Sequence, residues 1–267
     1  MDSQNWVKRL HNWTRTTAGS IASAIMFYTR LPVPSRWCLN FDRVARHAPL
    51  VGLLIGAILA ALDAGLAQVN VPIMTRSVIV ALGWIGITGG LHLDGVMDTA
   101  DGLAVPDAKR RLSVMADSRV GAFGAMAGAG LIFLKATALG DIERYRSAVL
   151  IVVAGWGRWG QQLAIARYPY LRPEGKGAMH KQAIPSVATT LPSLLLLLVG
   201  HLALIFLQGG GLLLGFGSTA MAGAIAWGSG FWLHRRLGGH TGDTYGAVVE
   251  WTEAIALVGF ATLLATK

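Results

Sequence analysis

Charged residues, acids above all, and cysteine are scarce in this chain. Of its 267 residues 14% are charged, against about 25% in soluble domains, and only 14 are Asp or Glu. Hydrophobic residues make up 53%, and the mean hydropathy is +0.51. Such a composition excludes an ordinary soluble domain and predicts a polytopic membrane protein. The single cysteine, Cys38, excludes an internal disulfide and a cysteine-based zinc site.

Signals of secretion and of internal division are also missing. Residues 1–17 are mixed polar and lack the charged, apolar and small-residue regions of a signal peptide. No repeat with a period of roughly 20 to 50 residues recurs, and no Pro- or Ser-rich linker divides the chain. We therefore expect one integral membrane domain over residues 1–267, inserted by its own spans.

Apolar stretches of membrane-crossing length recur along the chain, since a helix needs roughly 20 residues to cross a bilayer. A shorter stretch, residues 18–28, falls below that length. The sequence predicts an all-α fold, a polytopic membrane helix bundle of about seven transmembrane helices plus an N-terminal interfacial or re-entrant helix. The long stretches are residues 48–68, 73–91, 120–139, 147–166, 184–207, 212–233 and 244–266.

Lys and Arg are unevenly distributed over the connections between these stretches. Seventeen fall in the N-terminal region and in the loops after the second, fourth and sixth stretches, and four fall on the opposite side. Because cytoplasmic loops carry an excess of Lys and Arg, the basic loops are predicted to be cytoplasmic. The basic residues are spread over short loops instead of one soluble face, which argues against nucleic acid as a partner.

Three aspartates stand close together where the second apolar stretch ends. Asp94, Asp98 and Asp101 have the spacing i, i+4, i+7, which places them on one face of a helix. Three anions on one face repel one another unless a cation lies between them. A hard divalent cation such as Mg²⁺, bound through carboxylates and completed by water and substrate phosphates, would meet that need. The alternative is a solvated helix end.

A second acidic motif near the C-terminus repeats this pattern. In both motifs a carboxylate follows a Gly-Gly pair by four residues and a further acid comes seven residues later, and in the second motif these acids are Asp243 and Glu250. Solvated helix ends rarely repeat acids and glycines at matching offsets in a chain so poor in acids. We expect the two motifs to converge on one site.

Other charged residues stand inside apolar stretches, where an unpaired charge is costly. Arg158 lies about halfway along its stretch and either forms a structural ion pair or contacts a substrate phosphate. Glu250 and Glu253 must face a cavity or a partner. Lys135 and Asp63 lie near the outer ends of their stretches, so we expect them to reach the membrane surface without a function.

Two loops combine cations with groups that suit phosphate. Asp117, Ser118 and Arg119 directly precede a Gly-rich helix start, where backbone N–H groups and a guanidinium could bind phosphate while the acid helps to hold a metal. The alternative is a helix N-cap with flanking charges. The loop at 168–177, with two aromatics and Arg172, could stack on a ring and contact an anion, or lie at the membrane interface.

Five segments in a fixed order over nearly the whole chain match the motifs of one family. They are residues 27–34, which include Arg30, and residues 92–102, 117–121, 158–177 and 239–253. The sequence resembles the cobalamin synthase family, also called adenosylcobinamide-GDP ribazoletransferase. Small departures are Ala116, where family members often carry lysine, and Trp251, where an aliphatic residue is usual.

The resemblance implies the reaction and its cofactor. Alpha-ribazole, or its 5'-phosphate, would be joined to adenosylcobinamide-GDP in the last stage of vitamin B12 synthesis, giving adenosylcobalamin or its 5'-phosphate and releasing GMP. Catalysis of such a phosphoryl transfer is mainly positioning and charge neutralisation. We expect one or two Mg²⁺ ions, with Asp94, Asp98, Asp101 and Asp243 as metal ligands.

The resemblance also distributes roles among residues. Arg30 and Arg119 are expected to clamp phosphate oxygens. Activation of the ribose hydroxyl stays open among the metal, His92, Asp243, His240 and Glu250, and the two histidines could equally be structural. The predicted catalytic residues are Asp94, Asp98, Asp101, His92, Asp243 and Glu250, and the predicted substrate-binding residues are Arg30, Asp117, Ser118, Arg119, Arg158, Arg172, His240 and Thr241.

Other membrane proteins also carry acids at helix ends. A CDP-alcohol phosphatidyltransferase needs Asp-x2-Asp-Gly, whereas this chain has Asp94-Gly95-x2-Asp98. A polyprenyl transferase also uses two acidic motifs, and these are usually of the Asn/Asp-x-x-x-Asp kind. A cation-coupled transporter predicts acids near the midplane of several broken helices, whereas most acids here lie at one face.

The expected partners are adenosylcobinamide-GDP, alpha-ribazole and membrane lipid, and no nucleic acid. Association with other enzymes of corrinoid assembly and a homo-oligomer stay open. We expect the protein in the bacterial cytoplasmic (inner) membrane, with the active site on the cytoplasmic side.

Overall fold

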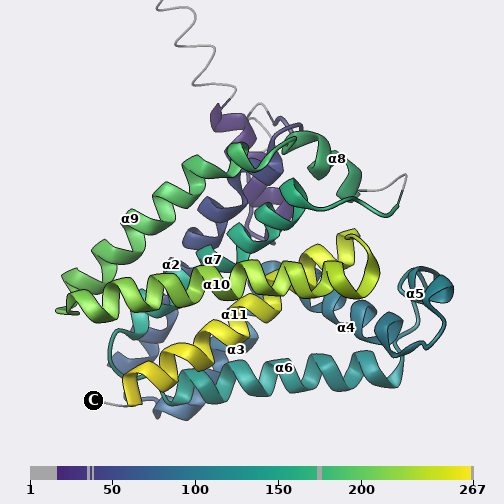
Figure 1. The fold of residues 1–267 in the computed structure, drawn as a ribbon. Helices are drawn as coiled ribbons and strands as arrows, with labels where there is room; N and C mark the ends of the chain where they lie inside the picture. Colours follow the sequence, from purple (N-terminus) through teal and green to yellow (C-terminus); the bar gives the residue numbers. More distant parts are fainter. Residues whose placement is uncertain (1–16, 35–36, 38, 173–175, 266–267) are drawn as a thin grey trace, which may run out of the picture.

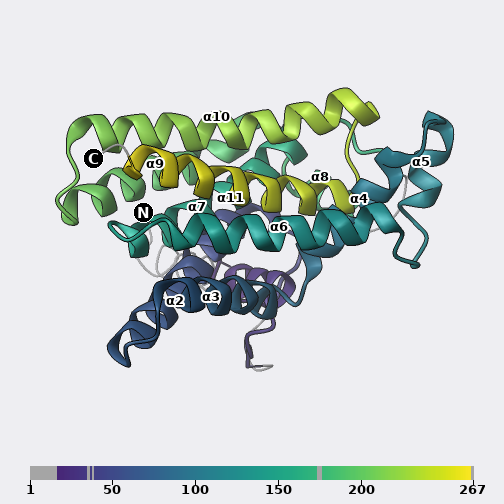
Figure 2. The ribbon, with the colours of Figure 1, turned by 90° about the horizontal axis from the view of Figure 1, so that it is seen from below.

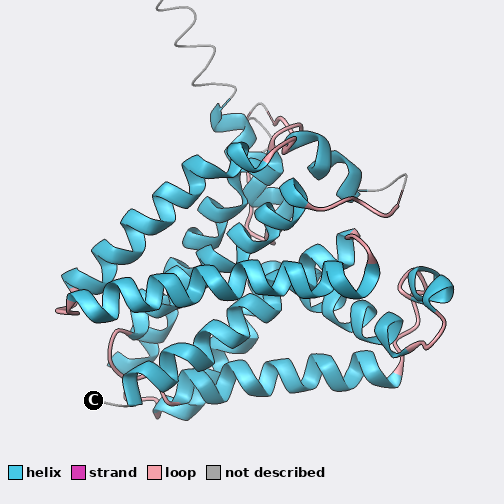
Figure 3. Cartoon of the chain, viewed as in Figure 1, coloured by secondary structure: helices cyan, strands magenta, loops and turns pink. Residues whose placement is uncertain are grey.

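The structure, a computed structural model, describes residues 17–34, 37, 39–172 and 176–265. Cys38 lies outside the described residues. Within them no strand forms, and one isolated bridge joins Tyr170 to His240 (Figures 1 and 3). The predicted all-α fold is confirmed. The helices are the N-terminal Thr17–Tyr28, η1 Val44–His47, α2 Ala48–Gln68, α3 Ile73–Thr88, α4 Leu91–Ala104, α5 Ala108–Val114, α6 Ala122–Gly140, α7 Arg146–Arg167, α8 Lys176–Ala183, η2 Val187–Thr190, α9 Leu191–Leu207, α10 Leu212–Leu237 and α11 Gly242–Ala265.

Helix α7 forms the centre of the bundle. It packs against α2, α9, α10 and α11, and every residue from 152 to 166 is buried. Helix α11 lies between α10 and α6, and Figure 2 shows these three helices side by side. Because other helices shield α7 from lipid, this helix can hold Arg158, Gln161 and Gln162 in its second half.

Five helices of the described chain are long and apolar enough to cross a membrane, and the count reaches six only if α3 and α4 form one broken span. The polytopic bundle is therefore confirmed, but the count of seven is not. All seven predicted stretches are helical in at least their main part. Two of them account for the difference: residues 147–166 belong to the polar central helix α7, and residues 73–91 stop short at Thr88.

The chain turns by 92° between α3 and α4. Gly89 and Gly90 have φ of 62° and 73°, a left-handed conformation that side chains disfavour. The turn sends α4 across the bundle, where it packs between α6 and α11. Because of this turn, the three aspartates lie on a helix held by two neighbours and not at the end of a straight span.

The short N-terminal helix ends at the same corner. The predicted helix over residues 18–28 is present, and its Ala24 and Tyr28 belong to the core formed by α2, α3 and α7. Directly after it, the Arg30 N–H donates to the Ile87 carbonyl, 2.7 Å away. This bond brings Arg30 beside the turn between α3 and α4.

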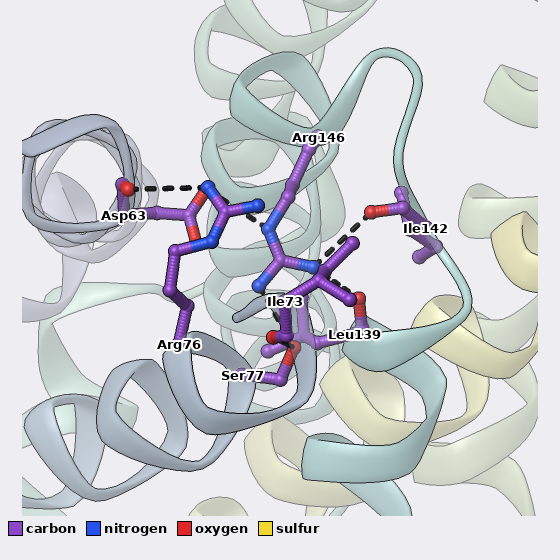
Figure 4. A network of polar contacts seen from close by, with 7 residues as sticks. All are labelled: Asp63, Ile73, Arg76, Ser77, Leu139, Ile142 and Arg146. Atoms are coloured by element: carbon purple, nitrogen blue, oxygen red, sulfur yellow. Dashed lines mark hydrogen bonds and ion pairs between the residues drawn. The ribbon is translucent and has the colours of Figure 1, made fainter. Parts of the chain in front are cut away.

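A polar network joins α2, α3, α6 and α7 near the start of α3 (Figure 4). The Asp63 carboxylate pairs with Arg146 at 2.9 Å and with Arg76 at 3.4 Å. Arg146 also donates to Ser77 and to the carbonyls of Leu139 and Ile142. The expectation that Asp63 reaches the membrane surface is wrong: it is 6% exposed, because two arginines neutralise it inside the bundle.

Candidate active site

The two acidic motifs pack directly against each other. Helices α4 and α11 cross where Gly95 faces the main chain of Asp243, so closely that a β carbon on Gly95 would collide with the Asp243 carbonyl. One turn along, a β carbon on Gly246 would come within 3.1 Å of the His92 α carbon. The main chains of the two motifs therefore meet, and the convergence of their carboxylates on one site stays a prediction.

Carboxylates gather at this crossing. The charge of Asp98 interacts with those of Asp94, Asp243 and Asp101, while Arg172 is a nearby cation. Arg172 pairs with the Asp243 carboxylate at 3.0 Å, and the Thr241 hydroxyl donates to the same oxygen at 3.3 Å. The acids outnumber the cation, so the crossing carries an excess of negative charge.

Asp101 has an additional task at the far end of α4. Its two oxygens accept the N–H groups of Gly121 at 2.7 Å and Gly124 at 2.8 Å, so Asp101 caps the first turn of α6 from another helix. The sequence left open whether this helix start binds phosphate or is a helix N-cap with flanking charges, and here the N–H groups bind a carboxylate. The metal role of Asp101 stays a prediction.

The loop before α6 lies at the Asp101 end of the site. Arg119 forms a two-pronged pair with Asp117, with a shortest distance of 2.7 Å, and both face solvent beside the exposed Ser118. The Arg119 guanidinium lowers the pKa of the Asp117 carboxyl to about 2. Asp101, where this loop meets α4, lies about 10 Å from Asp94 along the helix, at 1.5 Å per residue. Substrate contact by these three residues stays a prediction.

His92 is held by Arg158 at the base of the crossing. The Arg158 guanidinium lies 2.9 Å from the His92 Nε2 and stacks over the Tyr28 ring at 4.8 Å. Because arginine only donates, Nε2 must accept, and the neutral imidazole then carries its proton on Nδ1. His92 can therefore donate a hydrogen bond only from Nδ1. Among the described residues no carboxylate forms an ion pair with Arg158, which lies instead against a histidine and an aromatic ring. Its contact with a substrate phosphate stays a prediction.

Glu250 and Glu253 form a buried ion cluster with Lys135. The Lys135 ammonium lies 2.6 Å from each carboxylate and 4.5 Å from the centre of the Trp84 ring. The expectation that Lys135 reaches the membrane surface is wrong, since it is 4% exposed and balances these two acids. The buried acids that would suit a transporter are thus paired, and the catalytic role of Glu250 stays a prediction.

His240 ties the loop before α11 to the loop after α7. Its main chain exchanges bonds with Pro169 and Leu171 at 2.9 and 2.8 Å. Its ring nitrogens lie 3.1 Å from the Thr244 hydroxyl and from the Gly230 carbonyl, and burial lowers its pKa to about 4. This bridge sets the position of Arg172 beside Asp243. Substrate contact by His240 stays a prediction.

Two neighbouring hollows share Asp94 as a lining residue. The smaller, about 250 Å³, extends between α7, α11 and the loop that holds Arg172. The larger, about 570 Å³, lies over the turn between α3 and α4 and includes Arg30. Phe27, Leu91 and Asp94 line both. A group bound at Asp94 can therefore be reached from two sides.

Sequence reasoning missed several residues of the smaller hollow. Tyr28, Gln161, His180 and Tyr245 line it, with Tyr170 stacked on Tyr245 at 6.0 Å. The signal for Gln161 was available, because a glutamine pair in an apolar helix needs polar partners. Of the predicted site residues, those that line the hollows are Arg30, His92, Asp94, Arg172 and Asp243.

The described residues contain no group of three or more His, Cys, Asp or Glu side chains arranged to hold a metal ion. A site that relies on fewer protein ligands still suits Mg²⁺, which often binds one or two carboxylates and completes its shell with water and substrate phosphates. The oxygen donors and the excess negative charge at Asp94, Asp98 and Asp243 fit such an ion.

Comparisons with known proteins agree with one another. A model of the family described as Cobalamin-5-phosphate synthase matches residues 20–261. Adenosylcobinamide-GDP ribazoletransferase of Trichormus variabilis is 52% identical over 238 residues, covering 89% of this chain and 94% of the relative. Proteins of the same name from Synechococcus elongatus and Prochlorococcus marinus are 49% and 35% identical, over 93% and 99% of this chain and 96% and 99% of the relatives. No solved structure matches the chain.

The match covers the elements that build the crossing. Residues 20–261 include the turn between α3 and α4, the aspartates of α4, the loop with Arg172 and the acids of α11. The chain belongs to the cobalamin-5-phosphate synthase family, the adenosylcobinamide-GDP ribazoletransferases.

Proposed function

We propose that the transfer takes place at Asp94, the residue that the two hollows share. Members of this family join adenosylcobinamide-GDP to alpha-ribazole or its 5'-phosphate, forming adenosylcobalamin or its 5'-phosphate and GMP. A ribose hydroxyl attacks the phosphorus next to the cobinamide, the new P–O bond forms, and the pyrophosphate P–O bond to GMP breaks. Two substrates must reach one phosphorus, and the two hollows that share Asp94 support this location.

Asp94 and Asp98 would hold Mg²⁺ at this point, with water and substrate phosphates completing its shell. When bound, the ion would neutralise the negative charge of the pyrophosphate. Oxygen ligands, the shortage of nearby cations and the position at the junction support the assignment. Asp101 would contribute through its hold on α6, and any further bond to the metal would be additional to that role.

Two arginines would bind the phosphate oxygens from opposite sides. Arg172 lies in the smaller hollow and Arg30 in the larger one, so each side of the junction has one guanidinium. Guanidinium groups suit phosphate because they donate two parallel hydrogen bonds. They would fix the reacting phosphorus between the two substrates.

Asp243 is the best-placed acceptor for the proton of the attacking hydroxyl. Among the four candidates, His92 uses Nε2 to accept from Arg158, His240 has both ring nitrogens bonded, and Glu250 is paired with Lys135. The Asp243 carboxylate lines the hollow, and Arg172 orients it through one oxygen. This leaves Asp243 in the position of a general base.

The site end of the bundle would face the cytoplasm of the bacterial inner membrane. Arg172, the basic end of α10 at Arg235 and Arg236, and the basic helix α5 belong to the connections on this side. The excess of Lys and Arg there supports this orientation. In a Cys38-free chain, Lys109→Cys should resist an impermeant thiol reagent in intact cells, and labelling from outside would overturn the orientation.

Turnover by the purified protein in detergent tests the proposal. With adenosylcobinamide-GDP, alpha-ribazole and Mg²⁺ we expect GMP release matched by formation of the cobalamin product. Asp94→Asn should lose at least about a hundredfold in kcat, since metal affinity depends on ligand charge. Asp141→Asn, an exposed acid at the end of α6, is the matched control and should keep full activity. A fully active Asp94→Asn, or undiminished turnover after exhaustive chelation, would overturn the proposal.

A further inference from the structure

Four of the residues that line the smaller hollow carry buried polar atoms that have no partner among the described residues. They are the Tyr28 hydroxyl, the His92 Nδ1, the Gln161 Oε1 and the Tyr245 hydroxyl, on side chains that are 1 to 4% exposed. A buried polar group without a hydrogen bond costs stability. Four such atoms around one cavity indicate that a polar ligand completes their bonds.

The hydrogen-bonding character of these atoms can be assigned. His92 donates from Nδ1, because its Nε2 accepts from Arg158. Gln161 Oε1 can only accept, and the two tyrosine hydroxyls can do either. These atoms are therefore complementary to a ligand that has hydrogen-bond acceptors and at least one N–H or O–H donor.

Rings form the walls of the cavity. Tyr28 stacks on His180 at 5.9 Å, Tyr170 stacks on Tyr245 at 6.0 Å, and Phe27 meets His180 edge to face at 4.9 Å. Flat apolar walls with polar edges suit a planar heterocycle. The volume of about 250 Å³ suits one bicyclic base and is too small for a corrin ring.

The position of the cavity adds a phosphate to this description. Asp94, Asp243 and Arg172 line the same space, so a nucleoside bound there would present its phosphate to the proposed reaction point. Both substrates of the family reaction carry a bicyclic base. The dimethylbenzimidazole of alpha-ribazole offers only one ring nitrogen as acceptor, whereas guanine offers acceptors at O6 and N7 and donors at N1 and N2.

We propose that this cavity binds the guanine of adenosylcobinamide-GDP, with Gln161 as a specificity-determining residue that accepts from the N1–H or the 2-amino group. The assignment rests on the proposed function and deepens it. The larger hollow around Arg30 is then left for alpha-ribazole. Its hydroxyls of Thr29 and Thr88 already donate to helix carbonyls, so it offers less to a polar base edge.

The test is direct binding of nucleotides to the purified full chain in detergent, measured by titration calorimetry without corrinoid. Wild type should bind GMP about tenfold or more tightly than AMP or alpha-ribazole 5'-phosphate, because a site built for donors loses affinity when they are absent. Inosine monophosphate, which keeps N1–H and lacks the 2-amino group, should fall between. These comparisons use the unaltered protein and so do not depend on the folding of any variant.

Gln161→Met keeps the length of the side chain and removes the acceptor. We expect it to lower GMP affinity about tenfold, to equalise GMP and AMP, and to raise KM for adenosylcobinamide-GDP without changing KM for alpha-ribazole. Gln161→Glu keeps an acceptor oxygen and should retain the preference for GMP. Gln182→Met, an exposed glutamine on α8, is the matched control and should match wild type.

Three results would overturn the guanine assignment: equal wild-type affinity for GMP and AMP, tighter binding of alpha-ribazole 5'-phosphate that displaces GMP, or a folded Gln161→Met with wild-type GMP affinity. None of these three results bears on the proposed transferase reaction, which is tested by turnover of the wild type and of Asp94→Asn. Conversely, if the protein shows no turnover but still selects GMP, the proposed function is contradicted and the guanine assignment is not.

Discussion

The main chain of Asp243 lies directly against Gly95, where any β carbon would meet the Asp243 carbonyl. This contact fixes the distance between the two acidic motifs, because α4 and α11 cannot approach so closely with a larger residue at that point. The arrangement of the proposed site therefore depends on a residue that carries no chemistry of its own.

Gly95→Ala should separate the motifs and reduce kcat more than it raises either KM. We expect a loss of at least about tenfold, since misplacement of reacting groups by about 1 Å can cost a hundredfold. Gly86→Ala is the control: its added β carbon meets nothing within 4 Å, so activity should not change. Comparable activity of the two variants would show that the close crossing is dispensable.

Asp101→Ala should lower the stability of the protein by about 0.5 to 2 kcal/mol, the range measured for losing a helix cap. The Gly121 and Gly124 N–H groups would lose their acceptors, so the first turn of α6 should loosen. Thermal unfolding in detergent measures this change. If Asp101 acts only as a cap, the Mg²⁺ concentration for half-maximal rate should stay near wild type, whereas a rise as large as that of Asp94→Asn would identify a metal ligand.

Lys135→Met should strongly destabilise the protein, because it leaves Glu250 and Glu253 buried without their cation. Removal of one partner from a buried ion pair costs about 3 to 5 kcal/mol. Lys109→Met, on the exposed face of α5, should leave the unfolding temperature unchanged. An unaltered unfolding temperature for Lys135→Met would contradict a structural role for the cluster.

Acid should destabilise the fold partly through His180. Burial lowers its pKa from 6.5 to about 4, so the unfolded chain takes up this proton more readily than the folded one. The contribution of His180 is complete above pH 6.5 and is lost as the pH falls from about 6.5 to about 4. His180→Phe cannot titrate and keeps the ring contacts, so its unfolding temperature should fall less over that interval, and an identical pH profile would refute the assignment.

Much of the fold and part of the site could be predicted from the sequence because their signals are local. Apolar length indicated the helices, and the spacing of Asp94 and Asp98 indicated a helix face at the end of apolar sequence. The turn at Gly89 and Gly90 was visible as a Gly-Gly pair, but its angle depends on the packing of α4 between α6 and α11. That packing is a long-range property.

The misplaced residues share one cause, which is pairing across distant segments. Lys135 and Asp63 are expected at the membrane surface because each stands near the end of its own helix. The partner of Lys135, Glu250, is more than a hundred residues away in the sequence. The partner of Asp63, Arg146, lies on another helix. Asp101 likewise caps a helix 20 residues further along. No pattern within one helix can reveal such partners.

Kinetics of the double variant Asp94→Asn with Asp243→Asn test the central claim, a single site built from both motifs, most directly. Residues that act as one unit give strongly non-additive losses. We expect kcat of the double variant to be within about threefold of the slower single variant, with wild-type folding of all three. Losses that multiply fully across the two changes would show two independent sites and contradict the account.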